Sequence, residues 1–179
     1  MDYFYLLPLL AAGDVAIEFS ATRGGPSEED YFDFFYHKSG EIPADVTLEF
    51  SIRGSDPAVL DTADVLPCSA GFLISRRMLE AISHLISSEI ESRGAAVRIG
   101  QQRNDQFVVF RTRKDLPVLQ ADPEKFQTWI NALVRTDLAD SFNVATDMAT
   151  KEFIFSQRVI DIAEKTELGC SWKKIRNAR

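Results

Sequence analysis

The carboxylates around residue 30 are the first residues in this sequence whose types and spacing could do chemistry. Four of them cluster in one short stretch: Glu28, Glu29, Asp30 and Asp33. Asp137 and Asp140 form a second group, one helical turn apart. A hydrolase uses two carboxylates as general acid and general base, so both groups are candidates for that chemistry. Acid clusters of this kind are usually solvated, and a hydrolase is therefore the least favoured function.

Residue types that hold metals, phosphates or cofactors form no recognisable motif. The two histidines, His37 and His84, belong to no metal-ligand spacing, and Cys68 lies far from Cys170. The only double glycine, at residues 24–25, is followed by a proline and by acids that would repel a phosphate. The sequence predicts no metal, no cofactor and no enzymatic activity.

The acids of residues 28–36 are interleaved with aromatic residues, and this composition favours protein binding. Aromatic anchors rimmed by charge are typical of interface hot spots, and the charge speeds association. If residues 31–36 form a strand, Phe32, Phe34 and Tyr36 face the core while alternate residues face outward. The predicted partner-binding residues are Glu28, Glu29, Asp30, Tyr31, Asp33 and Phe35.

The charge of the chain is unevenly distributed. The 179 residues carry a net charge of −7, and residues 1–70 hold 13 acids against 3 bases. A surface of that kind repels nucleic acid and anionic membranes and favours a cationic partner. The alternative is a solvated face that only aids solubility.

The ends and the cysteines predict a cytoplasmic protein that contacts no membrane. Two distant cysteines favour a reducing compartment, and no apolar run reaches the roughly 20 residues of a spanning helix. The apolar stretch from Tyr3 to Ala12 follows Asp2, where a signal peptide needs positive charge, and Pro8 interrupts it.

Hydrophobic periodicity predicts a single α+β domain over residues 1–179, with an antiparallel sheet in the N-terminal half and helices mainly in the C-terminal half. A two-lobed shape would divide it into a strand-rich part, about 1–66, and a mixed part, 67–179. Strands are expected at 3–10, 15–19, 31–36, 46–53, 97–99, 107–112 and 153–155. Helices are expected over 78–90, ending at Arg93-Gly94, from Asp122 through Trp129 and Leu133, and over 159–165.

Two of the expected helix starts resemble each other. Residues 72–77 read Phe-Leu-Ile-Ser-Arg-Arg, and residues 153–158 read Phe-Ile-Phe-Ser-Gln-Arg. Each predicts a short buried strand, a serine N-cap and an amphipathic helix, with Ser75 and Ser156 as caps rather than nucleophiles. The repeat is too short to establish a duplicated domain.

These segments resemble a class of bacterial immunity proteins that accompany polymorphic or contact-delivered toxins. The resemblance rests on Phe72–Met78 after Val65-Leu66-Pro67, and on Phe153–Val159 followed by Leu168-Gly169 and Trp172. It covers about a third of the chain, chiefly residues 65–90 and 152–172. It implies a small cytosolic, non-enzymatic protein that binds a cognate toxin and occludes its active site.

The acidic first half fits that role, because many toxins that act on nucleic acid are basic. The expected partner is therefore a toxin with a basic surface. The first alternative is a regulatory or scaffold module that uses the same acidic and aromatic surface for another partner, and a homodimer through the exposed aromatics is a further alternative.

Overall fold

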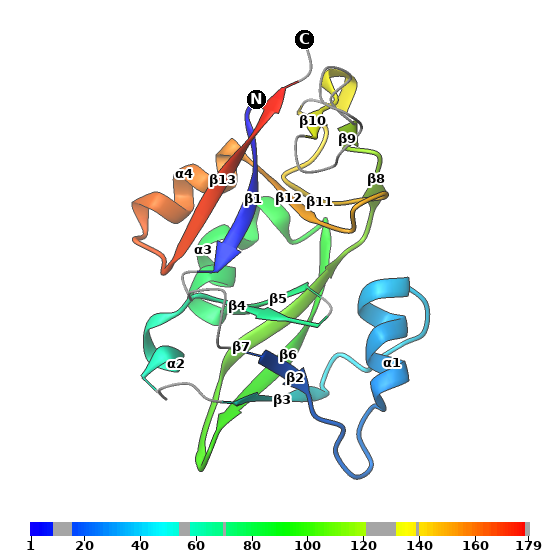
Figure 1. Cartoon of the computed structure of the whole chain (residues 1–179), viewed down its shortest axis with the longest axis vertical. Helices are drawn as coiled ribbons and strands as arrows, with labels where there is room; N and C mark the ends of the chain where they lie inside the picture. The colour runs from blue at the N-terminus through cyan, green and yellow to red at the C-terminus, as the bar shows by residue number, and fades with distance from the viewer. Residues whose placement is uncertain (9–15, 54–57, 70, 121–131, 139, 178–179) are drawn as a thin grey trace.

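The computed structural model describes residues 1–8, 16–53, 58–69, 71–120, 132–138 and 140–177, and it shows two curled sheets stacked along the long axis (Figure 1). The six-stranded sheet has the order β2 (Ala16–Phe19), β3 (Thr47–Arg53), β6 (Ile90–Ile99), β7 (Gln102–Thr112), β5 (Gly71–Ser75) and β4 (Val65–Cys68). The seven-stranded sheet has the order β8 (Asp115–Leu116), β11 (Val144–Asp147), β12 (Phe153–Ser156), β1 (Tyr3–Pro8), β13 (Cys170–Asn177), β10 (Leu133–Val134) and β9 (Leu119–Gln120).

The helices of the described residues are short and occur in both halves of the chain. They are α1 (Glu28–Phe32), its π-helical continuation η1 (Asp33–His37), α2 (Val59–Thr62), α3 (Arg76–Ile86), the 3₁₀ turn η3 (Thr136–Leu138) and α4 (Gln157–Lys165). The expected α+β division is therefore wrong: the described fold is mostly β. The chain passes between the sheets twice: from β1 of the seven-stranded sheet to β2 of the six-stranded sheet, and after Thr112 from β7 back to β8.

Several expected elements are confirmed, and three differ from the structure in type or in their ends. β3 has the expected alternation, with Leu48, Phe50 and Ile52 buried. The strand predicted over 31–36 is helical instead. The helix predicted over 78–90 ends at Ile86, because Ile90 already begins β6 and Arg93-Gly94 lies inside that strand. The helix predicted from Asp122 falls mostly outside the described residues, and its expected end at Leu133 is strand β10.

The two sheets repeat one arrangement of strands. Hairpin β4–β5, helix α3 and strand β6 recur as hairpin β11–β12, helix α4 and strand β13. In each set one antiparallel strand lies between the hairpin and the strand after the helix: β7 in the first repeat and β1 in the second. In the first repeat, β3 pairs in parallel with β6 and antiparallel with β2. In the second repeat, β10 pairs in the same way with β13 and β9. The chain therefore contains two structural repeats with the same strand arrangement.

The residue register is the same in both repeats. In the first repeat, Phe107 of the central strand β7 pairs with Ser75 on one side and Ala95 on the other. In the second repeat, Tyr3 of the central strand β1 pairs in the same way with Ser156 and Ile175. The sequence similarity between residues 72–77 and 153–158 therefore belongs to a structural repeat that extends over both sheets. The first repeat runs over 16–112, whereas the second takes its central strand, β1, from the opposite end of the chain.

The two repeats contact each other reciprocally. Asp64, just before β4, receives a hydrogen bond at its carboxylate from the N–H of Gly169, just before β13, at 2.6 Å. In the other direction, Asn143, just before β11, donates its N–H to the carboxylate of Glu89, just before β6, at 2.9 Å. A Cβ on Gly169 would lie 2.4 Å from the carbonyl oxygen of Thr62, so only glycine permits this approach.

The buried side chains of the described residues form three hydrophobic cores. One lies within the six-stranded sheet, whose edge strands β2 and β4 contact each other, and includes the buried side of α1 and η1. The second joins the repeats through α3 and α4, and the third lies beneath β1, β9 and β10. Because the central core contains residues of both repeats, the two sheets are packed together rather than tethered by a linker.

Candidate protein-binding surface

The acidic and aromatic segment forms a helix because its N-terminus is capped. The side chain of Ser27 accepts a hydrogen bond from the N–H of Asp30 at 3.1 Å, and the Asp30 carboxylate accepts from the N–H of Ser27 at 2.8 Å. This reciprocal pair is a capping box. The carboxylates of Glu28 and Glu29 also lie in the first turn, where they complement the positive end of the helix dipole.

The structure divides the predicted partner-binding residues into two groups. Glu28, Glu29 and Asp30 are exposed. Tyr31 and Phe35 are buried, so their expected outward orientation is wrong. A helix of about 3.6 residues per turn places residues 31, 34 and 35 on one face, whereas a strand would have placed residue 34 opposite residues 31 and 35. Asp33 is half-buried at the end of α1. The exposed part of the predicted site is therefore its three leading acids.

The buried aromatic rings fix the helix to the six-stranded sheet. The ring of Tyr31 stacks on Phe19 of β2 with centroids 4.6 Å apart, and it meets Phe50 of β3 edge to face at 5.7 Å. Phe35 packs against the same tyrosine at 5.1 Å. Sequence signals for this arrangement were present in the Ser27-to-Asp30 capping pattern and in the helical spacing of the aromatics.

Two arginines hold the other side of the helix. The guanidinium of Arg111 lies 3.7 Å from the centroid of the Phe34 ring, and that of Arg93 lies 4.5 Å from it. Both arginines bind Glu91, and Arg111 also donates to the carbonyl of Phe34 at 2.9 Å. Burial acts to raise the pKa of Glu91, but the hydrogen bonds from Arg111 and Arg93 outweigh it and lower the pKa overall. Sequence reasoning missed this cluster, because its members are far apart in the chain.

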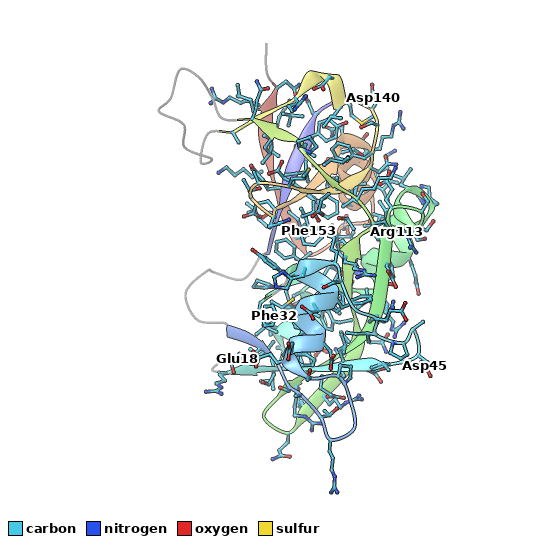
Figure 2. All side chains as sticks on the ribbon, turned by 90° about the vertical axis from the view of Figure 1, so that its right-hand side faces the viewer. Glu18, Phe32, Asp45, Arg113, Asp140 and Phe153 are labelled. Carbon is cyan, nitrogen blue, oxygen red and sulfur yellow. The ribbon has the colours of Figure 1, made fainter. Side chains whose placement is uncertain are left out.

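A pocket of about 330 Å³ lies between the repeats, beside the end of η1. Its apolar lining includes Phe72 and Phe153, which are equivalent residues of the two repeats with ring centroids 6.1 Å apart. Gly71 has φ +116°, and a Cβ there would lie 2.8 Å from the Phe153 ring. Figure 2 looks onto this side of the molecule and shows Phe153 beyond the upper end of the helix that carries Phe32.

A polar cluster spans the repeats next to this pocket. Lys38 donates to the carboxylate of Asp115 and to the hydroxyl of Thr112, the latter at 2.7 Å. Lys151 donates to the same carboxylate at 3.1 Å. Both lysines have left-handed backbone conformations, with φ of 56° and 60°. Burial lowers the pKa of Lys38, although its hydrogen bond to Asp115 acts in the opposite direction.

The remaining candidates for chemistry are dispersed. His37 and His84 are both exposed, and Asp137 forms an ion pair with Arg135 at 2.7 Å. Burial, together with the charge of Asp64, raises the pKa of the Cys170 thiol to about 12. No group of three or more His, Cys, Asp or Glu side chains within the described ranges is placed to hold a metal ion.

No helix in the described part of the chain combines the length and apolar character needed to cross a membrane.

Comparisons with known proteins assign this protein to no family, so its function has to be argued from its own residues. The sequence matches no protein-family model, and a search of curated proteins finds no significant relative.

Proposed function

We propose that this protein is a non-enzymatic immunity protein that binds a cognate bacterial toxin through a basic surface of that toxin and occludes its active site. One observation carries the proposal: the first turn of α1 presents the exposed carboxylates of Glu28, Glu29 and Asp30 on a rigidly anchored helix. The sequence resemblance to immunity proteins supports the same function.

The anchoring of α1 matters for affinity as well as for stability. An inhibitor loses less conformational entropy on binding when its contact residues are already held in place. Buried rings on one side and the Arg93 and Arg111 cluster on the other hold this helix before any partner arrives. The carboxylates at its start would attract a cationic surface and accelerate association.

Co-expression with the product of the neighbouring gene tests the proposal directly. The expected result is survival of cells that the neighbouring protein alone kills, together with co-purification of the two proteins. A lethal neighbour that this protein neither rescues nor binds would contradict the proposal. A harmless neighbour without a complex would favour the scaffold alternative, and self-association through the same face would favour the homodimer.

A further inference from the structure

The pocket between the repeats is walled by aromatic rings from both of them. Phe72 of the first repeat and Phe153 of the second line it. Phe35 and Tyr36 complete this wall, and Tyr36 is 45% exposed. The volume of about 330 Å³ lies at the lower end of the range for small-molecule sites. The pocket therefore suits a compact ligand with an aromatic body.

The polar wall of the pocket carries two ammonium groups on the same side as the Phe153 ring. Thr146 of β11 pairs with Phe153 of β12 and with Asp115 of β8, so these three side chains share one face of the sheet. The Asp115 carboxylate on that face binds the amines of Lys38 and Lys151. Both lysines line the pocket together with Thr146.

The charges at this wall favour an anion. The single carboxylate of Asp115 faces two ammonium groups, so the three side chains carry one net positive charge. Glu152 is the only acid among the described lining residues, and the alternation along β12 places its side chain on the face opposite Phe153. The charge of Glu152 accordingly acts on Tyr5, whose pKa burial raises to about 12 with a smaller contribution from this carboxylate.

The two ammonium groups keep N–H donors for a ligand. Each ammonium has three donors. At Lys38 the described hydrogen bonds use two of them, one to Asp115 and one to Thr112 at 2.7 Å. At Lys151 they use one, to Asp115 at 3.1 Å. An anion can accept from the remaining donors while these contacts persist.

The backbone holds both lysines in conformations that are common at functional sites. Lys38 has φ of 56° and follows the π-helical segment η1, and Lys151 has φ of 60°. Left-handed conformations cost energy in residues other than glycine and concentrate at ligand sites, as π-helical turns do. The positions of the two amines are therefore imposed by the fold.

We propose that this pocket binds a small aromatic carboxylate, with the ring against Phe72 and Phe153 and the carboxylate at the two ammonium groups. Carboxylates form charge-assisted hydrogen bonds with ammonium groups, and aromatic rings attract one another in offset and edge-to-face contacts. Such a ligand would touch both repeats and stabilise their packing. The site is separate from the proposed toxin contact, because the exposed acids of α1 do not line it.

Titration of the full-length protein with hydrocinnamate, followed by NMR, tests this site. We expect saturable shifts of the pocket residues, with a dissociation constant in the millimolar range or tighter for a ligand of this size. Hydrocinnamide should bind about fivefold more weakly, because a neutral amide forms weaker hydrogen bonds with ammonium groups. Propionate, which lacks the ring, should also bind more weakly, and phenylpropylammonium should bind most weakly.

A pair of lysine substitutions tests the charged wall. Lys151→Gln should weaken binding of hydrocinnamate about fivefold and reduce the preference for the carboxylate over the amide. Lys165→Gln, a change of an exposed lysine on α4, should leave both unchanged. Intermolecular NOEs from the ligand ring to Phe72 and Phe153 should locate the aromatic body.

Equal binding of hydrocinnamate, its amide and the cation to the wild-type protein would overturn the proposal, as would the absence of saturable shifts at tens of millimolar ligand. An equal effect of the two lysine substitutions would also contradict it. A protein that binds hydrocinnamate but neutralises no toxin would lose the immunity function and keep this site. Neutralisation of a toxin without hydrocinnamate binding would remove the site alone.

Discussion

Asp64 and Asn143 occupy the same position in the two repeats, and each accepts a hydrogen bond from the serine that precedes the following helix. The carboxylate of Asp64 accepts from the hydroxyl of Ser75, and the amide oxygen of Asn143 accepts from Ser156 at 3.3 Å. The N–H of each serine also donates to the backbone carbonyl of the same partner at 2.9 Å. The acceptor is charged at one site and neutral at the other, and the surroundings explain why.

Asp64→Asn should destabilise the protein by about 1–3 kcal/mol at neutral pH. Asp64 is buried and also accepts from Arg77 and from the N–H of Gly169, so an amide would set its NH₂ group against these donors. Asn143→Asp should cost a similar amount. It would lose the hydrogen bond from Asn143 Nδ2 to the carbonyl of Leu85 at 3.1 Å and place a second carboxylate beside Glu89. Urea unfolding of both variants measures these losses.

The cost of Asp64→Asn should depend on pH. Burial alone would raise the pKa of Asp64, but the hydrogen bonds from Arg77, Ser75 and Gly169 lower it overall. A carboxyl whose folded pKa is depressed contributes stability above its unfolded pKa of about 3.9 and loses it as pH falls through the folded pKa. The difference between wild type and Asp64→Asn should therefore shrink below about pH 4. An unchanged difference down to about pH 2.5 would contradict the role of the charge.

A circular permutant should keep the stability of the wild type. Because β1 pairs antiparallel with β13 and fills the place that β7 fills in the first repeat, residues 1–8 can follow residue 177 through a short hairpin turn. Figure 1 shows both termini at the same end of the molecule. The permutant opens the chain between residues 8 and 16. We expect thermal unfolding within a few degrees of the wild type, whereas deletion of residues 1–8 should unfold the second repeat.

Arg111→Lys should destabilise the protein by about 1–2 kcal/mol. A lysine cannot stack on Phe34, bind Glu91 and donate to the Phe34 carbonyl at the same time, as the planar guanidinium does. Arg113→Lys is the matched control. Arg113 is exposed, and the hydrogen bond described for it is donated by its backbone N–H to the carbonyl of Glu89, which a lysine keeps. Equal unfolding midpoints for the two variants would show that the stacked arginine contributes little.

Charge reversal at Glu28 and Glu29 should slow association with the toxin about tenfold at low salt. These two acids are better choices than Asp30, which forms the capping box, or Asp33, which is half-buried. A matched double variant, Glu80→Lys with Glu164→Lys, changes the net charge equally from exposed positions on α3 and α4. Stopped-flow association rates for the two double variants give the comparison.

The effect of the α1 reversal should diminish as salt is added, because exposed charges are screened. Equal association rates for the two double variants would remove α1 from the interface. Thermal unfolding measured in parallel separates this result from the loss of the favourable helix-dipole contacts, about 0.3–1 kcal/mol for each residue.

Local patterns predicted those elements whose own residues decide the outcome. The alternation in residues 46–53 predicts β3, and the serine starts with helical spacing predict the starts of α3 and α4. The same local reasoning was wrong for residues 31–36. There, consecutive aromatics satisfy a strand pattern and a helix pattern equally, and the capping box decides for the helix.

The sequence by itself therefore determined the acidic first half, the short elements and the two similar helix starts. Tertiary structure alone decided that these starts belong to duplicated sheets, because strand neighbours are chosen by pairing across long separations in the chain. It also decided which predicted binding residues reach the surface: packing against Phe19 and Phe50 buries Tyr31, and the carboxylates of Glu28 and Glu29 remain in solvent.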